Sequence, residues 1–223
     1  MSDVRTTVVM YDTQISEAEI GCLRGLMISV AGGNSLFHNH QGEGYRYAYP
    51  LVQYKRIAGH AALVGIGEGA DAVAQLAFDH PKVEGRIGRR QVEMSVANMR
   101  MESSDISCGG EMDRRYKVSR WMPLNEKNYH AYRSTQGLIE RMAMMERLLT
   151  ANILSFAKGV GVFFDREVRN SLTRLVVAGH AMRKGVEMMA FDAEFASNVE
   201  MPDYVGIGKG ASIGRGTLMR RRI

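Results

Sequence analysis

Hydrophobic and polar positions alternate along the first half of the chain in a pattern that predicts both strands and helices. Residues 6–11 form a short run rich in β-branched side chains, which indicates a strand. Ser16 and Glu19 form a capping-box pair, and apolar residues at helical spacing then predict a helix that ends near Val30. We expect further strands at 47–56, 61–66 and 92–101, with a short helix over 69–78. The order β-α-β-β-α-β is the ferredoxin-like arrangement, which the RRM module shares.

The second half repeats this pattern in a shorter form. A strand is predicted at 116–122, and Asn125 is predicted to cap a long helix. The apolar stripe of that helix is typical of a core-facing helix and comprises Leu138, Met142, Met145, Leu149 and Phe156. The remaining predicted strands cover 168–178, 186–196 and 217–221.

These elements predict an α+β protein of two tandem ferredoxin-like, RRM-like βαββαβ domains. The second domain is abbreviated and carries a C-terminal glycine-rich loop. The polar stretch 103–110 contains two adjacent glycines and marks the boundary. We therefore expect an N-terminal domain over 1–106 and a C-terminal domain over 107–223.

Composition narrows the class of protein. The 223 residues are 45% hydrophobic and 24% charged, which is ordinary for a soluble globular chain. No apolar run approaches the roughly 20 residues of a membrane helix, and the N-terminus does not resemble a signal peptide. Cys22 and Cys108 cannot form a disulfide framework. We expect a cytoplasmic protein with no membrane partner.

The charge is unevenly distributed. Residues 1–112 hold 10 Lys/Arg and 13 Asp/Glu, a net of −3, whereas 113–223 hold 19 and 11, a net of +8. This asymmetry indicates that the second half meets a polyanion, of which nucleic acid is the leading candidate. A solvated basic face is the alternative.

The glycine-rich stretch 206–216 is the first candidate binding site. Five glycines and two cations there would let a phosphate backbone approach the main chain. A Walker loop is excluded because glycine, not Ser/Thr, follows Lys209. A plain glycine-rich hairpin is the alternative. The candidate RNA-binding residues here are Gly206, Gly208, Lys209, Gly210, Ser212, Gly214, Arg215 and Gly216.

A second glycine-rich turn, at 65–70, fits the loose dinucleotide pattern G-x-G-x-x-A. A dinucleotide site would need a parallel strand after the following helix. Residues 79–85 are too irregular to predict such a strand. A tight strand-to-helix turn is the simpler interpretation, and a nucleotide-binding enzyme stays as an alternative.

His38 and His40 are the candidate catalytic pair. Side chains two residues apart point the same way in an extended backbone, and imidazoles titrate near neutrality. One could deprotonate a ribose 2′-hydroxyl while the other protonates the leaving 5′-oxygen. Arg46 or Lys55 could stabilise the charge of the phosphorane, and Arg46 is also a candidate RNA-binding residue. Zinc ligation and two inert surface histidines are the alternatives; the possible third zinc ligands are Glu43, His60 and His80.

Together these motifs resemble a known family. The segments that carry the resemblance are Leu-Phe-His-Asn-His at 36–40, Tyr-Pro-Leu-Val-Gln-Tyr-Lys at 49–55, the turn at 65–70, and Met-Pro-Asp-Tyr-Val-Gly-Ile-Gly-Lys at 201–209. They are similar, in order, to the CRISPR-associated endoribonucleases called Cas six, in particular their b subtype.

The resemblance implies metal-independent, cofactor-free cleavage of CRISPR repeat RNA in precursor transcripts. The products would carry 5′-hydroxyl and 2′,3′-cyclic phosphate ends. It places the catalytic histidines on His38 and His40 and a supporting tyrosine on Tyr47. It also implies that the protein stays bound to the crRNA with other subunits of an interference complex. An inactive RNA-binding subunit is the alternative function.

Overall fold

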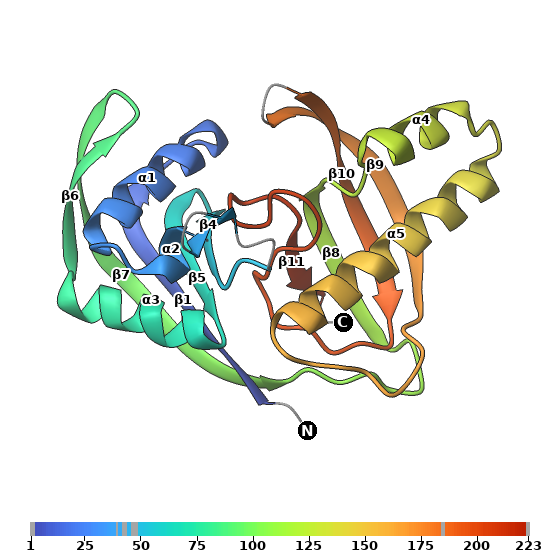
Figure 1. Ribbon diagram of the computed structural model, residues 1–223, viewed down its shortest axis with the longest axis horizontal. Helices are drawn as coiled ribbons and strands as arrows, with labels where there is room; N and C mark the ends of the chain where they lie inside the picture. Colours follow the sequence, from blue (N-terminus) through green and yellow to red (C-terminus); the bar gives the residue numbers. More distant parts are fainter. Residues whose placement is uncertain (1–2, 39, 42–43, 46–48, 184–185, 222–223) are drawn as a thin grey trace. The chain divides into compact units, whose positions relative to one another are not determined.

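The computed structural model describes residues 3–38, 40–41, 44–45, 49–183 and 186–221, which form two compact units (Figure 1). The N-terminal unit contains residues 3–104 together with the short segment 211–214. The C-terminal unit contains residues from 105 onward except that segment. The glycine-rich loop is therefore shared, because its tip belongs to the N-terminal unit.

A five-stranded sheet forms the N-terminal unit. Its strand order is β4-β5-β1-β7-β6. The strands are β1 (Asp3–Gln14), β4 (Val52–Ile57), β5 (His60–Ile66), β6 (Lys82–Ile87) and β7 (Arg90–Asp105). The first four positions, β4-β5-β1-β7, follow the strand order of a ferredoxin-like fold, and β6 extends the edge. A separate two-stranded ladder consists of β2 (His40–Gln41) and β3 (Gly44–Tyr45).

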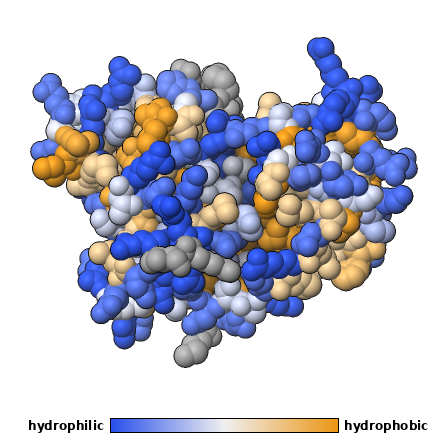
Figure 2. Space-filling view, turned by 180° about the vertical axis from the view of Figure 1, so that it is seen from behind, coloured by the Kyte–Doolittle hydropathy of each residue, from blue (hydrophilic) through white to orange (hydrophobic). Residues whose placement is uncertain are grey.

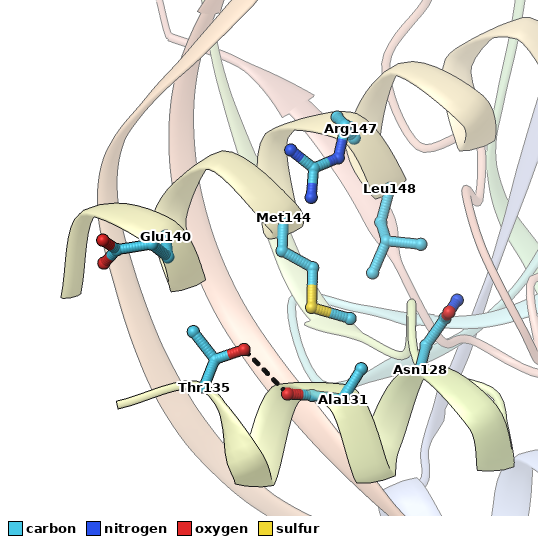
Figure 3. Close-up of a pocket in the computed structure, with 7 residues that line it drawn as sticks. All are labelled: Asn128, Ala131, Thr135, Glu140, Met144, Arg147 and Leu148. Carbon is cyan, nitrogen blue, oxygen red and sulfur yellow. Dashed lines mark hydrogen bonds between the residues drawn. The ribbon is translucent and has the colours of Figure 1, made fainter. Parts of the chain in front are cut away.

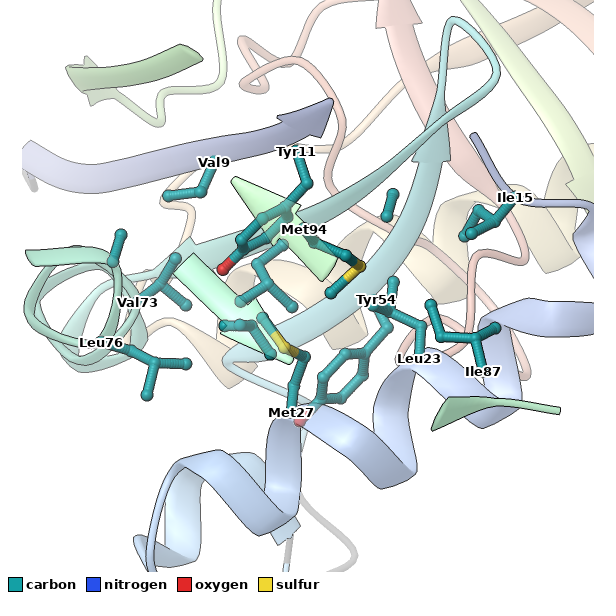
Figure 4. Close-up of a cluster of buried hydrophobic side chains, with 14 of the residues drawn as sticks. Val9, Tyr11, Ile15, Leu23, Met27, Tyr54, Val73, Leu76, Ile87 and Met94 are labelled. Atoms are coloured by element: carbon teal, nitrogen blue, oxygen red, sulfur yellow. The ribbon is translucent and has the colours of Figure 1, made fainter. Parts of the chain in front are cut away.

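The helices of this unit enclose its core against the sheet. They are η1 (Glu17–Glu19), α1 (Ile20–Val30), the single turn α2 (Ser35–His38) and α3 (Glu68–Asp79). Figure 4 shows side chains of α1 and α3 meeting those of the strands in one apolar cluster. Tyr11 of β1 and Tyr54 of β4 are the largest buried residues in that cluster. The predicted capping box is confirmed, since the Ser16 main-chain N donates to Glu19 Oε2 at 2.7 Å.

Strand β6 is one of the elements that the sequence did not predict; the others include the turn α2 and the short strands β2 and β3. Its charged residues and Gly85 make the stretch irregular, yet it pairs antiparallel with β7 at the sheet edge. Gly85 has a packing role, because a Cβ there would lie 2.3 Å from Leu26 Cδ1 of α1. The missing side chain lets the helix approach the edge strand.

The C-terminal unit has a four-stranded sheet of order β11-β8-β10-β9. Its strands are β8 (Arg114–Trp121), β9 (Asn170–Arg183), β10 (Val186–Ser197) and β11 (Thr217–Arg220). This is again the ferredoxin-like order. Residues 198–216, all of them described, contain no helix between β10 and β11. The domain is therefore abbreviated as predicted, with the glycine-rich loop in place of the second helix.

The long helix predicted from Asn125 is two helices. Asn125 Oδ1 accepts from Asn128 N at 2.8 Å and caps α4 (Glu126–Ser134). The chain then breaks, and α5 (Leu138–Gly159) begins after Gly137. The predicted stripe holds at Met145, Leu149 and Phe156, which are buried, but Leu138 at the new N-terminus is 75% exposed. The chain leaves the helical conformation at Thr135, whose ψ is 119°, so the break falls before the apolar stripe begins.

Hydrophilic side chains cover most of the face in Figure 2, with separate apolar clusters between them. The most exposed large apolar side chains of the described residues are Phe78, Leu138, Ile139 and Phe163. None of the helices described is both long enough and apolar enough to cross a membrane.

Candidate functional site

His38 is the last residue of the one-turn helix α2. The Asn34 side-chain oxygen accepts from Leu36 N at 3.1 Å and starts the turn, while Phe37 is buried and anchors it. His38 itself is half-buried. The two histidine side chains would point the same way in an extended backbone, but His38 is helical, so this condition is not met there.

The second histidine lies in strand β2, where its main chain pairs with Tyr45 of β3. The side chain of His40 lies outside the described part of the chain, as do residues Arg46 and Tyr47 altogether. The structure therefore places one of the two candidate imidazoles and the backbone of the other. Their roles, and those predicted for Arg46 and Tyr47, stay predictions.

Two side chains that the sequence analysis did not single out hold the His38 turn. The Tyr54 hydroxyl donates to the Phe37 carbonyl oxygen at 3.1 Å. The Arg24 guanidinium donates to the His38 carbonyl oxygen at 3.1 Å. Tyr54 is within a segment that carried the family resemblance, but nothing in the sequence pairs it, or Arg24 of α1, with the histidine segment.

Lys55 of β4 has no exposed surface. Its ammonium donates to the carbonyl oxygen of Ala211 at 3.2 Å. Burial lowers the pKa of this ammonium to about 7. A group that stabilises a phosphorane must touch the phosphate, and Lys55 instead contacts the main chain of the glycine-rich loop. The structure thus gives Lys55 a position from which it supports the loop tip.

The loop tip binds to β4, which is the outer strand at one edge of the N-terminal sheet. Tyr54 N donates to the Ser212 carbonyl oxygen at 2.9 Å, and Tyr54 forms a parallel bridge with Ile213. A Cβ at Gly214 would lie 2.7 Å from Ile20 Cδ1. The tip is therefore fitted closely to the N-terminal unit, to which it belongs.

The base of the loop is built into the C-terminal unit. Ile207 N donates to the Gly216 carbonyl oxygen at 2.9 Å, and Gly216 adopts a φ of +61°. A Cβ at Gly216 would come within 1.9 Å of Ile207 O. Gly206 and Gly216 are buried, so they shape the loop. Among the predicted binding residues, those that are half-buried and can meet a ligand are Gly208, Lys209, Gly210, Ser212, Gly214 and Arg215.

A basic face lies on the C-terminal sheet. Exposed Arg115 and Lys117 alternate along β8 with buried Tyr116 and Val118, so the two cations share the face opposite the core. The register places Lys117 beside Glu194 of β10, which in turn lies opposite Arg174 of β9. We call this the basic sheet face; its residues are Arg115, Lys117, Arg174, Arg221 and Glu194.

Glu194 of the basic sheet face pairs with Arg174 at 3.6 Å and with Arg221. Asp192 lies two positions earlier on β10 and faces the same way. The four cations outnumber these two acids, which leaves a net positive surface that suits a phosphate backbone. The charge count along the sequence placed the positive excess in residues 113–223, but it could not assign that excess to one face of a sheet.

The turn at 65–70 does not form a dinucleotide site. The strand after α3 is β6, which pairs antiparallel with β7 at the sheet edge and not beside β5. A Cβ at Gly65 would lie 2.1 Å from Gly69 O, and one at Gly69 would lie 2.2 Å from Leu51 O. The glycines permit close packing of strand and helix, which is the simpler of the two predicted interpretations.

A pocket of about 420 Å³ lies between α4 and α5 (Figure 3). Its polar groups include Glu140, Arg147 and Thr135, whose hydroxyl donates to the Ala131 carbonyl oxygen at 2.8 Å. It contains neither histidine nor cysteine. Among the side chains that the structure describes, no cluster of three or more His, Cys, Asp or Glu could hold a metal ion.

Solved structures share this architecture of two ferredoxin-like units. A crystal structure described as Cas6b aligns with a TM-score of 0.87 and 25% identity over 99% of this chain and 100% of that one. Another, described as the CRISPR RNA processing endoribonuclease Cas6b, aligns with a TM-score of 0.76 at 22% identity, over 99% and 100% of the two chains. The expected fold is thereby confirmed.

Family models identify the chain more closely. The Cas6b N-terminal domain matches residues 2–105, and the Cas6b C-terminal domain matches residues 110–221. The protein belongs to the Cas6b family, as the sequence motifs predicted. An uncharacterized protein of Methanocaldococcus jannaschii is also 32% identical over 108 residues, which are 48% of this chain and 71% of that protein.

Proposed function

We propose that this protein is a metal-independent endoribonuclease that cuts CRISPR repeat RNA in precursor transcripts to give crRNA. Family membership across both domains is the observation that carries the proposal. His38 supports it, because a half-buried imidazole at the end of an anchored turn is accessible and positioned. The basic sheet face supplies the complementary charge for the RNA.

In the proposed reaction, one histidine of the pair His38 and His40 removes the proton of the ribose 2′-hydroxyl. The 2′-oxygen attacks the adjacent phosphorus, and the bond from phosphorus to the 5′-oxygen breaks. The other histidine donates a proton to that leaving oxygen. The products are a 2′,3′-cyclic phosphate and a 5′-hydroxyl, so the step consumes no water.

The negative charge that builds up on the phosphorane needs a donor or a cation nearby. We assign this role to Arg46 and Tyr47, which follow the histidines in the chain. Lys55 is assigned the support of the loop tip, because its ammonium is buried against Ala211. Lys209 and Arg215 of the loop would contact the RNA backbone. We further propose that the protein acts in the cytoplasm and keeps its product within a CRISPR interference complex.

The test compares His38→Ala and His40→Ala in single-turnover cleavage of the repeat RNA from the organism's own CRISPR array. Each substitution should lower the cleavage rate by a factor of roughly 10² to 10⁴ and leave RNA binding nearly unchanged. His60→Ala and His130→Ala are matched controls, since both lie outside the proposed site. Wild-type rates in both site variants would refute the assignment, and tight binding without any cut by the unaltered protein would favour an RNA-binding subunit.

A further inference from the structure

The turn that carries His38 is too short to hold its own shape. A four-residue helix leaves its C-terminal carbonyls without partners inside the helix. In this protein two of these carbonyls, at Phe37 and His38, accept from the side chains of Tyr54 and Arg24, each at 3.1 Å. The two donors come from different elements, β4 and α1, so they hold the turn from two directions.

Tyr54 is a rigid donor. It has no exposed surface and lies in the apolar cluster of the N-terminal unit, where Figure 4 shows its ring beside Met27 and Leu23 of α1. Burial raises the pKa of its hydroxyl, so the hydroxyl stays protonated and donates across the neutral pH range. Its main-chain N is bound to Ser212 of the loop tip. A single residue thus joins the loop tip to the histidine turn.

Arg24 is the second donor. It is half-buried on α1, and the hydrogen bond from its guanidinium to the His38 carbonyl is charge-assisted. Phe37, only 2% exposed, fixes the residue before the histidine in the core. The buried ring and the two carbonyl contacts together leave the His38 backbone little freedom.

We propose that Tyr54 and Arg24 are positioning residues for His38, which hold the end of α2 so that the imidazole meets the scissile phosphate in register. This inference rests on the proposed function, since it assumes that His38 takes part in the proton transfers. A displacement of about 1 Å in a catalytic group can cost on the order of 10²-fold in rate. Removing either donor should therefore slow cleavage without weakening RNA binding.

Tyr54→Phe tests the first donor, because it removes one oxygen and keeps the ring. Tyr11→Phe is its matched control. Tyr11 is an equally buried tyrosine of the same cluster, and its hydroxyl has no hydrogen-bond partner among the described residues. We expect a tenfold or greater fall in single-turnover rate for Tyr54→Phe, wild-type cleavage for Tyr11→Phe, and unchanged affinity of both for a 2′-deoxy repeat RNA.

Arg24→Ala tests the second donor, with Arg90→Ala as its control. The Arg90 guanidinium also donates to a main-chain carbonyl, that of Gln14 at 3.1 Å, but this bond does not involve the His38 turn. We expect Arg24→Ala to lose tenfold or more in rate, and millimolar guanidinium ion to restore part of that loss. Arg90→Ala should cut at the wild-type rate once melting curves show that it is folded.

His38→Ala, measured in the same series, distinguishes failure of the proposed function from failure of the positioning role of Tyr54 and Arg24. If His38→Ala is inactive while Tyr54→Phe and Arg24→Ala cut at the wild-type rate, the positioning role is wrong and the proposed function stands. Equal losses in Tyr54→Phe and Tyr11→Phe would also overturn the positioning role, because they would reflect the core in general. If His38→Ala cuts normally, the proposed function fails and this inference fails with it.

Discussion

The ammonium of Lys55 and the carbonyl oxygen of Ala211 lie 3.2 Å apart, although 156 positions separate the two residues in the chain. The bond joins β4 to the tip of the glycine-rich loop inside the N-terminal unit. A lysine without exposed surface is costly to bury in its charged form. This cost gives the contact a signature that depends on pH.

Lys55→Met should change how stability depends on pH. Burial lowers the pKa of Lys55 from 10.5 to about 7, so between these values the unfolded chain binds a proton that the folded protein does not. The free energy of unfolding should therefore rise with pH in this window, by up to about 1.4 kcal/mol per pH unit, and be independent of this group below pH 7. Chemical denaturation at several pH values between 7 and 10 measures the slope.

The Lys55→Met protein should lose that rise. Lys82→Met is the control, because Lys82 is 70% exposed and its 3.4 Å pair with Glu93 is a surface contact. If Lys55→Met and the unaltered protein show the same slope, the ammonium is not buried in solution as the structure has it.

Gly216→Ala should destabilise the base of the glycine-rich loop. Its φ of +61° is unfavourable for alanine, and the added Cβ would collide with Ile207 O. We expect a loss of about 1–3 kcal/mol, seen as a lower melting temperature. Gly25→Ala in α1 should do the opposite and add about 0.5–1 kcal/mol, because that glycine is exposed, helical and has no atom within 4 Å of the new Cβ. Equal effects of the two changes would contradict the packing described here.

Lys117→Ala should weaken RNA binding through the loss of one phosphate contact on the basic sheet face. The slope of log affinity against log salt should fall by about 1, and the effect should be similar for different RNA sequences. Filter binding or fluorescence anisotropy at salt concentrations from roughly 50 to 300 mM measures this slope. Lys158→Ala, at the exposed end of α5, is the control. An unchanged slope for Lys117→Ala would remove this face from the RNA interface.

The order of elements was predictable because each signal is local. The capping pair Ser16 and Glu19 and the cap at Asn125 lie within three residues of their partners, and both are present. Strand β6 was missed because Gly85 weakens the pattern for a reason that only α1 supplies. The break before α5 was missed because the cap at Asn125 was joined to an apolar stripe that begins only at Leu138, after Gly137.

The candidate site was only partly predictable for the same reason. Residue type and spacing single out His38, but the donors that hold its turn lie on other elements. Arg24 is 14 positions from His38, and Tyr54 is 17 positions from Phe37, the residue that it contacts. Lys55 was expected to face a phosphate because a lysine is usually exposed, and only the folded chain shows that the loop tip covers it. Long-range contacts of this kind leave no periodic trace in a sequence.

Attack by the 2′-hydroxyl without a metal can be tested by cleavage of the repeat RNA in excess EDTA, beside a substrate with a single 2′-deoxy substitution at the cut site. We predict one cut in EDTA, a 2′,3′-cyclic phosphate on the upstream product, and no cut in the 2′-deoxy substrate. Cleavage that requires a divalent metal, or that proceeds without the 2′-hydroxyl, would contradict this prediction.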